Sequence, residues 1–133
     1  MDAPSPLFAT LIVALGGGIG AALRYHAGRI VGRIAGLQAT YPWPTFTINV
    51  VGSFAMGILA GWLARNGSGG ETWRLLIGVG VLGGFTTFSA FSLEIALLIE
   101  KGMIGLAAAY AATSIVAGAV GLFAGLAIMR GAA

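Results

Sequence analysis

The sequence contains no cysteine, which excludes disulfide bonds, thiolate nucleophiles and zinc sites built from thiolates. It has a single histidine, His26, with no histidine or glutamate at the spacing of a metal-binding motif. We therefore expect His26 to lie in an interfacial loop rather than to bind a metal. No pairing of a nucleophile with a base is recognisable, so the protein is not expected to be an enzyme.

Charged residues are almost as scarce. They make up 8% of the chain, whereas a soluble domain carries about 25%. Since 58% of the residues are hydrophobic, the chain cannot cover a surface that faces water. We expect a multi-pass protein of the cell (plasma or inner) membrane, with the lipid bilayer as its solvent. The net charge of +3 is small and no basic cluster is present, so nucleic acid is not an expected partner.

Four apolar stretches are long enough to cross a bilayer, which takes about 20 residues. They cover approximately residues 7–23, 44–64, 72–99 and 104–129, within a single all-α domain that fills residues 1–133. No lysine or arginine precedes the first stretch, which argues against a removable signal peptide. The segment 24–40 contains three arginines and is expected to form an interfacial helix or loop.

Many glycines are spaced by four residues within these stretches. The pairs are Gly16/Gly20, Gly57/Gly61, Gly80/Gly84 and Gly121/Gly125. Such pairs let helix backbones approach closely where lipid supplies no hydrophobic driving force. We expect tightly packed helices at these positions.

The loop charges choose no orientation. One side of a four-span protein would carry Arg65, Arg74 and Arg130, and the other Arg24, Arg29, Arg33 and Lys101. Lysine and arginine are enriched on the cytoplasmic side of membrane proteins, and three against four is nearly no bias. Two readings stay open: one decisive arginine sets a single orientation, or the chain inserts both ways and forms an antiparallel, dual-topology homodimer.

Polar side chains cluster in the second, third and fourth stretches. They are mostly hydroxyls and amides: Thr45, Thr47, Asn49, Ser53, Thr86, Thr87, Ser89, Ser92, Glu94, Tyr110, Thr113 and Ser114. Polar groups inside a membrane are costly and usually face a partner or a watery path. Hydroxyl and amide groups can donate to an anion without adding a charge that traps it, so the pattern favours an anion path over a cation path.

The string "GGFTTFSAFS" at residues 83–92 interrupts the third stretch. Glycine and threonine are weak helix formers, so we predict a break near Gly83–Thr87. A break frees carbonyl oxygens, which suit a hard cation such as Na⁺. Phe85, Phe88 and Phe91 recur every three residues and are expected to share one face. Their positive ring edges could meet a small anion, although plain packing is the alternative.

These residues resemble a known family. "GGFTTFSAFS", together with "TFTINVVGSFAMG" in the second stretch and "GGGIGAALRY" in the first, is similar to the Fluc (CrcB) family of fluoride channels. The resemblance covers all four stretches. It implies an antiparallel dual-topology homodimer with two pores that passes F⁻ passively and selectively out of the cytoplasm, which reduces fluoride toxicity.

The resemblance also implies roles for individual residues. A structural Na⁺ at the dimer interface would be bound by the backbone carbonyls of Gly83 and Thr86. The matched pore and vestibule positions are Asn49, Phe88 and Phe91, the hydroxyl residues Thr87, Tyr110 and Ser114, the vestibule residues Thr45 and Glu94, and the family arginine Arg24. The chain departs from the family one turn after Ser114, where Gly118 replaces a second serine.

Two other classes of membrane protein are weighed against this one. A proton-coupled exporter of cationic compounds needs a membrane-buried carboxylate, and only Glu94, near the end of its stretch, could serve. A subunit that only packs would not need the concentrated hydroxyl groups. Both are less consistent with the sequence than a fluoride channel.

Overall fold

A computed structural model of the chain describes residues 4–36, 38–66 and 70–131, and nearly all of these residues are helical. Four helical segments are long and apolar enough to cross a membrane, which confirms the four-span expectation. Three of them are the helices α1 (Pro6–Ala35), α2 (Trp43–Asn66) and α6 (Ile104–Gly131). The third segment is composite and consists of α3 (Glu71–Trp73), the π-helix η2 (Arg74–Leu82), α4 (Gly83–Phe85) and α5 (Phe88–Glu100).

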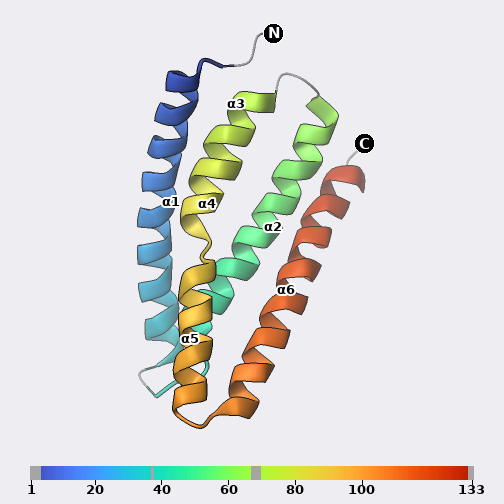
Figure 1. Cartoon of the computed structure of the whole chain (residues 1–133). Helices are drawn as coiled ribbons and strands as arrows, with labels where there is room; N and C mark the ends of the chain where they lie inside the picture. The colour runs from blue at the N-terminus through green and yellow to red at the C-terminus, as the bar shows by residue number, and fades with distance from the viewer. Residues whose placement is uncertain (1–3, 37, 67–69, 132–133) are drawn as a thin grey trace.

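The four segments run alternately down and up the bundle, so α1 begins and α6 ends at the same end (Figure 1). Helix α1 packs along η2 and α4, whereas α2 packs along α6. Helices α2 and α6 run in the same direction, each away from the end that holds the turn between α5 and α6 (Figure 1). The bundle therefore contains two closely packed helix pairs, and α5 lies where they meet.

Helix α1 is longer than the sequence indicated. It begins after Ser5, whose hydroxyl accepts a hydrogen bond from the Phe8 amide at 3.3 Å. It then continues through the segment where an interfacial helix or loop was expected and ends only at Gly36, which has a φ of 85° that favours glycine. His26 is consequently an exposed residue of this helix and not of a loop.

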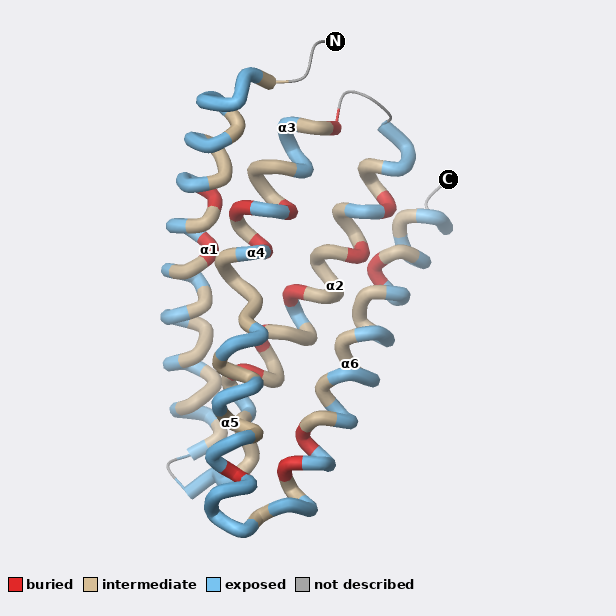
Figure 2. Tube along the Cα trace, viewed as in Figure 1, coloured by how far each residue is buried: buried red, intermediate tan, exposed pale blue. Residues whose placement is uncertain are grey.

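The spaced glycines allow the close helix approaches that the sequence predicted. A Cβ atom on Gly20 would collide with the carbonyl oxygen of Val81, and one on Gly84 with the backbone of Gly17. Where α2 packs along α6, a Cβ atom on Gly57 would collide with the carbonyl oxygen of Leu122. Figure 2 shows that the buried positions of α1 lie on its side toward α4. Backbone packs directly on backbone at both contacts.

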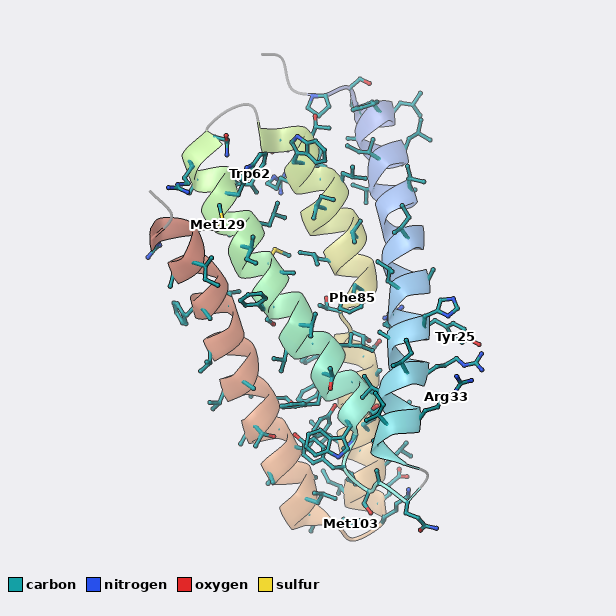
Figure 3. The ribbon with its side chains drawn as sticks, turned by 180° about the vertical axis from the view of Figure 1, so that it is seen from behind. Tyr25, Arg33, Trp62, Phe85, Met103 and Met129 are labelled. Atoms are coloured by element: carbon teal, nitrogen blue, oxygen red, sulfur yellow. The ribbon has the colours of Figure 1, made fainter. Side chains whose placement is uncertain are left out.

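Buried side chains cluster at the end of the bundle that holds the turn between α5 and α6. Leu98, Ala107 and Tyr110 form a buried cluster, and Phe91 and Met103 pack against it. Met103 marks this end in Figure 3. The cluster holds α5 against α6, where no spaced glycines are present on α5.

Candidate functional site

The third segment is broken at two threonines. Thr86 has an extended backbone with a ψ of 161°, and Thr87 follows with φ −151° and ψ 122°. This confirms the predicted break, but the two glycines before it, Gly83 and Gly84, stay helical. Gly84 serves the close approach to α1 instead. The Thr86 amide and hydroxyl both donate to the carbonyl of Leu82, at 2.9 and 2.8 Å, so the helical bonding continues up to Thr86. The Thr87 amide is the first to leave the helical pattern.

Asn49 of α2 holds the broken backbone. Its Nδ2 donates to the carbonyl of Thr87 at 3.0 Å, and its Oδ1 accepts from the Thr87 amide at 2.9 Å. A backbone group without a partner inside a membrane costs several kcal/mol. One amide side chain therefore replaces the two helical bonds that Thr87 has lost. The second N–H of the Asn49 amide is not needed for this pairing and is free to donate elsewhere.

The break places two helix ends of opposite polarity next to each other. Helix α5 begins at Phe88, and the hydroxyl of Thr87 accepts from the Ala90 amide at 3.3 Å as its N-cap. The N-terminus of a helix carries a partial positive charge that attracts anions, and free carbonyls at a C-terminus attract cations. The Thr87 amide that would otherwise bond Gly83 is taken by Asn49. Among the described residues, no backbone amide outside the helices donates to the Gly83 carbonyl.

Glu94 joins three of the four segments. Its Oε1 accepts from the hydroxyl of Thr45 at 2.6 Å, and its Oε2 accepts from the hydroxyl of Tyr110 at 2.7 Å. Thr45 and Tyr110 are both buried. Burying a carboxylate is costly unless it is hydrogen-bonded, and here each oxygen has a hydroxyl donor. The Tyr110 hydroxyl, which the resemblance places on the hydroxyl track, donates a hydrogen bond to Glu94 in the single chain.

The phenylalanine rings do not form the single stripe that their spacing suggested. The extended backbone at the break separates Phe85 from Phe88, so only Phe88 and Phe91 share a helix. The rings of Phe88 and Phe91 lie 5.9 Å apart, and that of Phe91 lies 5.1 Å from Tyr110. Phe91 is packed against the buried cluster, whereas Phe88 is 78% exposed in the single chain. Figure 3 shows Phe85 beside the break.

A cavity of about 280 Å³ opens at the break. Its lining consists of Asn49, Ser53, Met56, Thr86, Thr87, Phe88 and Leu122. Among the described residues, the buried hydroxyl oxygen of Ser114 has no hydrogen-bond partner. The amide and hydroxyl groups in this lining can donate hydrogen bonds to a dehydrated anion, and no acidic side chain is part of the lining.

Arg24 reaches the break from α1. Its Nη1 lies 3.5 Å from the carbonyl oxygen of Thr86, at the long limit of a hydrogen bond. The arginines farther along α1 behave differently: Arg33 points away from the bundle, as does Tyr25 (Figure 3). Arg24 is thus the arginine of α1 that contacts the site.

The structure brings the sequence-predicted residues together in two groups. Asn49, Thr86, Thr87 and Phe88 surround the cavity, and Thr45, Phe91, Glu94 and Tyr110 meet around the carboxylate. Sequence reasoning counted Ser53 among the clustered polar side chains but gave it no role, and the structure places it in the lining of the cavity. Its position one helical turn after Asn49 was the available signal. Gly52 was also missed, although a Cβ atom there would collide with the Thr86 methyl group.

Within the described residues, no group of three or more histidine or acidic side chains is close enough to bind a metal ion. A cation at the break would therefore depend on backbone oxygens. The carbonyl of Gly83 fits such a role because its usual helical donor is diverted to Asn49. The carbonyl of Thr86 fits less well in the single chain because Arg24 approaches it.

Comparison with known proteins places the sequence among membrane transport proteins. A family model described as CrcB-like protein, Camphor Resistance (CrcB) matches residues 11–126. A protein of Novosphingobium aromaticivorans named "Fluoride-specific ion channel FluC" is 70% identical over 94% of this chain and 98% of its own length. "Fluoride-specific ion channel FluC 2" of Nitrobacter hamburgensis is 55% identical over 90% of this chain and 95% of its own length. A protein of Caulobacter vibrioides, also named "Fluoride-specific ion channel FluC", is 52% identical over 90% of this chain and 94% of its own length.

Proposed function

The chain belongs to the CrcB family, and from that membership we propose that it is a fluoride-selective channel that lets F⁻ leave the cytoplasm and so reduces fluoride toxicity. It is a multi-pass membrane protein and not an enzyme. The relatives named fluoride-specific ion channels align over nearly their whole length, and the family match at residues 11–126 extends over all four spans of this chain.

The observation that carries the proposed path is the pairing of Asn49 with the broken backbone. It turns the positive end of α5 toward the cavity and leaves one amide N–H for an ion. Fluoride is small and strongly hydrated, so a pore must replace its water with close donors. The donors proposed are the Asn49 amide, the hydroxyls of Thr87 and Ser114, and the ring edges of Phe88 and Phe91.

Neutral donors suit conduction because an ion must also leave. A fixed cation would bind F⁻ strongly and slow its exit. Glu94 does not undo this arrangement, since both carboxylate oxygens accept hydrogen bonds, one from the Thr45 hydroxyl and one from the Tyr110 hydroxyl. We assign these three residues to the vestibule, where they position the carboxylate and the aromatic wall.

Purified protein in liposomes tests the function directly. We expect F⁻ efflux to exceed Cl⁻ efflux by at least about tenfold, equivalent to roughly 1.4 kcal/mol on the barrier. Equal rates for the two anions, or no flux of either from vesicles that contain folded protein, would contradict the assignment. A proton-coupled exporter would instead require a pH gradient for transport, and a packing subunit would transport neither ion.

We further propose that two copies assemble as an antiparallel, dual-topology homodimer. Arg24 contacts the break and so lies inside the bundle. The basic residues near the two ends of the bundle are then Arg65, Arg74 and Arg130 at one end and Arg29, Arg33 and Lys101 at the other, three against three. A chain without charge bias is free to insert in both directions. The exposed Phe88 ring is a surface that a second copy would cover.

Added charge tests the dual topology. Two or three lysines placed in one set of loops should force a single orientation and abolish fluoride flux when that variant is expressed alone. Flux should return when a variant with the opposite bias is co-expressed. Normal flux from one biased variant alone would show that opposite orientations are not required.

A structural Na⁺ at the dimer interface is the last part of the proposal. One chain offers the carbonyls of Gly83 and Thr86, which are too few for a hard cation, since such ions take about six oxygen ligands. A second, antiparallel copy would bring the set to four carbonyls, closer to that number, and would make the site depend on assembly. The ion would neutralise the facing carbonyl ends of the two α4 helices.

Thermal unfolding of the dimer tests the cation. Replacing Na⁺ with a large organic cation should lower the midpoint for the dimer, because the carbonyls would then face one another without a counter-charge. Thr86→Ala keeps the carbonyl and should retain the Na⁺ dependence. An identical midpoint with and without Na⁺ would remove the ion from the proposal and leave the fluoride path unaffected.

A further inference from the structure

Two polar rows run side by side on α2 and α6. On α2 the row is Thr45, Asn49 and Ser53, and on α6 it is Tyr110, Ser114 and Gly118. Residues four apart lie on the same face of a helix, so each row is a straight line along one helix. The rows rise at the same interval, and the helices run in the same direction (Figure 1).

Contacts at both ends show that the rows face each other. At one end Thr45 and Tyr110 share the carboxylate of Glu94. At the other end a Cβ atom on Gly118 would lie 3.5 Å from the Ser53 hydroxyl oxygen, an ordinary contact distance. One turn farther, Gly57 packs on the backbone of Leu122. Polar residues therefore stop at the step of Ser53, and tight apolar packing follows.

The Ser53 hydroxyl is available for a ligand. A serine within a helix commonly donates to the carbonyl four residues earlier, as Ser92 does to Phe88 at 3.0 Å. No such bond, or any other, involves the Ser53 hydroxyl within residues 4–36, 38–66 and 70–131. Ser53 is half-buried and lines the same cavity as Asn49 and Thr87. Gly118 has no side chain, so α6 places no hydroxyl opposite Ser53 at this step.

We propose that Ser53 is the last hydrogen-bond donor of the fluoride path on the α2 side and takes the place that the opposite row leaves empty at Gly118. This inference rests on the proposed function. An ion that leaves the Asn49 amide would meet the Ser53 hydroxyl before the path reaches Met56 and Leu122, which line the apolar end of the cavity. The donor row would thus pass from α6 to α2 at this step.

Moving the hydroxyl across the path tests the idea. Ser53→Ala should slow F⁻ efflux from liposomes by about tenfold, roughly the loss of one donor on the barrier. Adding Gly118→Ser to that variant restores a hydroxyl from the other helix, and the space beside Ser53 accommodates its Cβ. We expect the double variant to recover to within about threefold of the parent rate. Thr10→Ala is the matched control, because the Thr10 hydroxyl only donates to the Pro6 carbonyl on α1.

The outcomes separate the inference from the proposed function. A parent protein that does not conduct F⁻ would refute the function itself. A conducting parent with an equally fast Ser53→Ala variant would overturn only the role of Ser53. A slow Ser53→Ala variant that melts earlier than Thr10→Ala, and that Gly118→Ser does not rescue, would make Ser53 a packing residue and would also overturn the inference.

Discussion

The two halves of the broken third segment are held in place by different means. The first half, from Glu71 to Phe85, packs against α1 through glycines, with backbone in contact with backbone. The second half, from Phe88 to Glu100, packs against α2 and α6 through Glu94 and aromatic rings. One half is positioned by the absence of side chains, the other by specific polar side chains.

This difference separates what stabilises the bundle from what forms the proposed path. Backbone contacts in the first half leave no room for a side chain at Gly16, Gly20 and Gly84. Hydrogen bonds in the second half require polar atoms within the membrane, and at its start Asn49 and Thr87, which bond each other, also line the cavity. Substitutions in the two halves should therefore differ in whether they affect stability, flux or both.

The largest effect is expected at the junction of the halves. Asn49→Ala leaves the amide and carbonyl of Thr87 without partners, and each unsatisfied group costs about 1–3 kcal/mol. Flux should fall by at least about tenfold as the donor is lost. Asn66→Ala is the control, because Asn66 only donates to Trp62 at the exposed end of α2. Unfolding in mixed detergents and F⁻ efflux would be measured together, and an Asn49→Ala variant as stable as Asn66→Ala would contradict the account of the break.

A smaller loss of stability is expected in the first half. Gly20→Ala forces a methyl group against the carbonyl oxygen of Val81 and within 2.8 Å of the Phe85 amide nitrogen. Overpacking of this kind costs about 1–3 kcal/mol. Gly17→Ala, on the same helix, has nothing within 4 Å of the new atom and should be tolerated. The amount of monodisperse protein in gel filtration would compare the two, and equal yields would argue against backbone contact as the source of stability.

Glu94 tests whether hydrogen bonds position the second half. Glu94→Ala leaves the buried Tyr110 hydroxyl without an acceptor, at a cost of about 1–3 kcal/mol. Glu94→Gln keeps one acceptor oxygen and should cost less than the alanine variant. Glu100→Gln, at the exposed end of the same helix, should change nothing. A Glu94→Ala variant that unfolds like Glu100→Gln would show that the ring packing alone holds α5.

The smallest changes in stability are expected at Phe88 and Phe91, although substitutions there should still slow the flux of F⁻. Phe91→Ile should cost under about 1.5 kcal/mol because the ring packs on Tyr110. Phe88→Ile should cost under about 0.5 kcal/mol, since the ring is mostly exposed in the single chain. Both should nevertheless slow F⁻ efflux by at least about tenfold. Folded variants that conduct at the parent rate would return both rings to a packing role.

The sequence by itself determined the membrane class, the four spans and the glycine pairs. Scarce charge excludes a water-facing surface, and glycine spacing of four marks a helix face whatever the partner. The break was also predictable, because weak helix formers follow one another at Gly83–Thr87. Its position within that stretch was not, since helix propensity cannot distinguish glycines that pack against a neighbouring helix from threonines that bond their own backbone.

Only the tertiary structure decided which polar groups share a bond. Asn49 and Thr87 are 38 residues apart, and Thr45 and Glu94 are 49 apart. No local pattern links such positions, because a hydrogen bond depends on distances and angles that the packing of α2, α5 and α6 creates. The same packing brings the Tyr110 hydroxyl within hydrogen-bond distance of Glu94 and places Ser53 opposite Gly118, which has no side chain. The break in the third segment separates Phe85 from the other two rings.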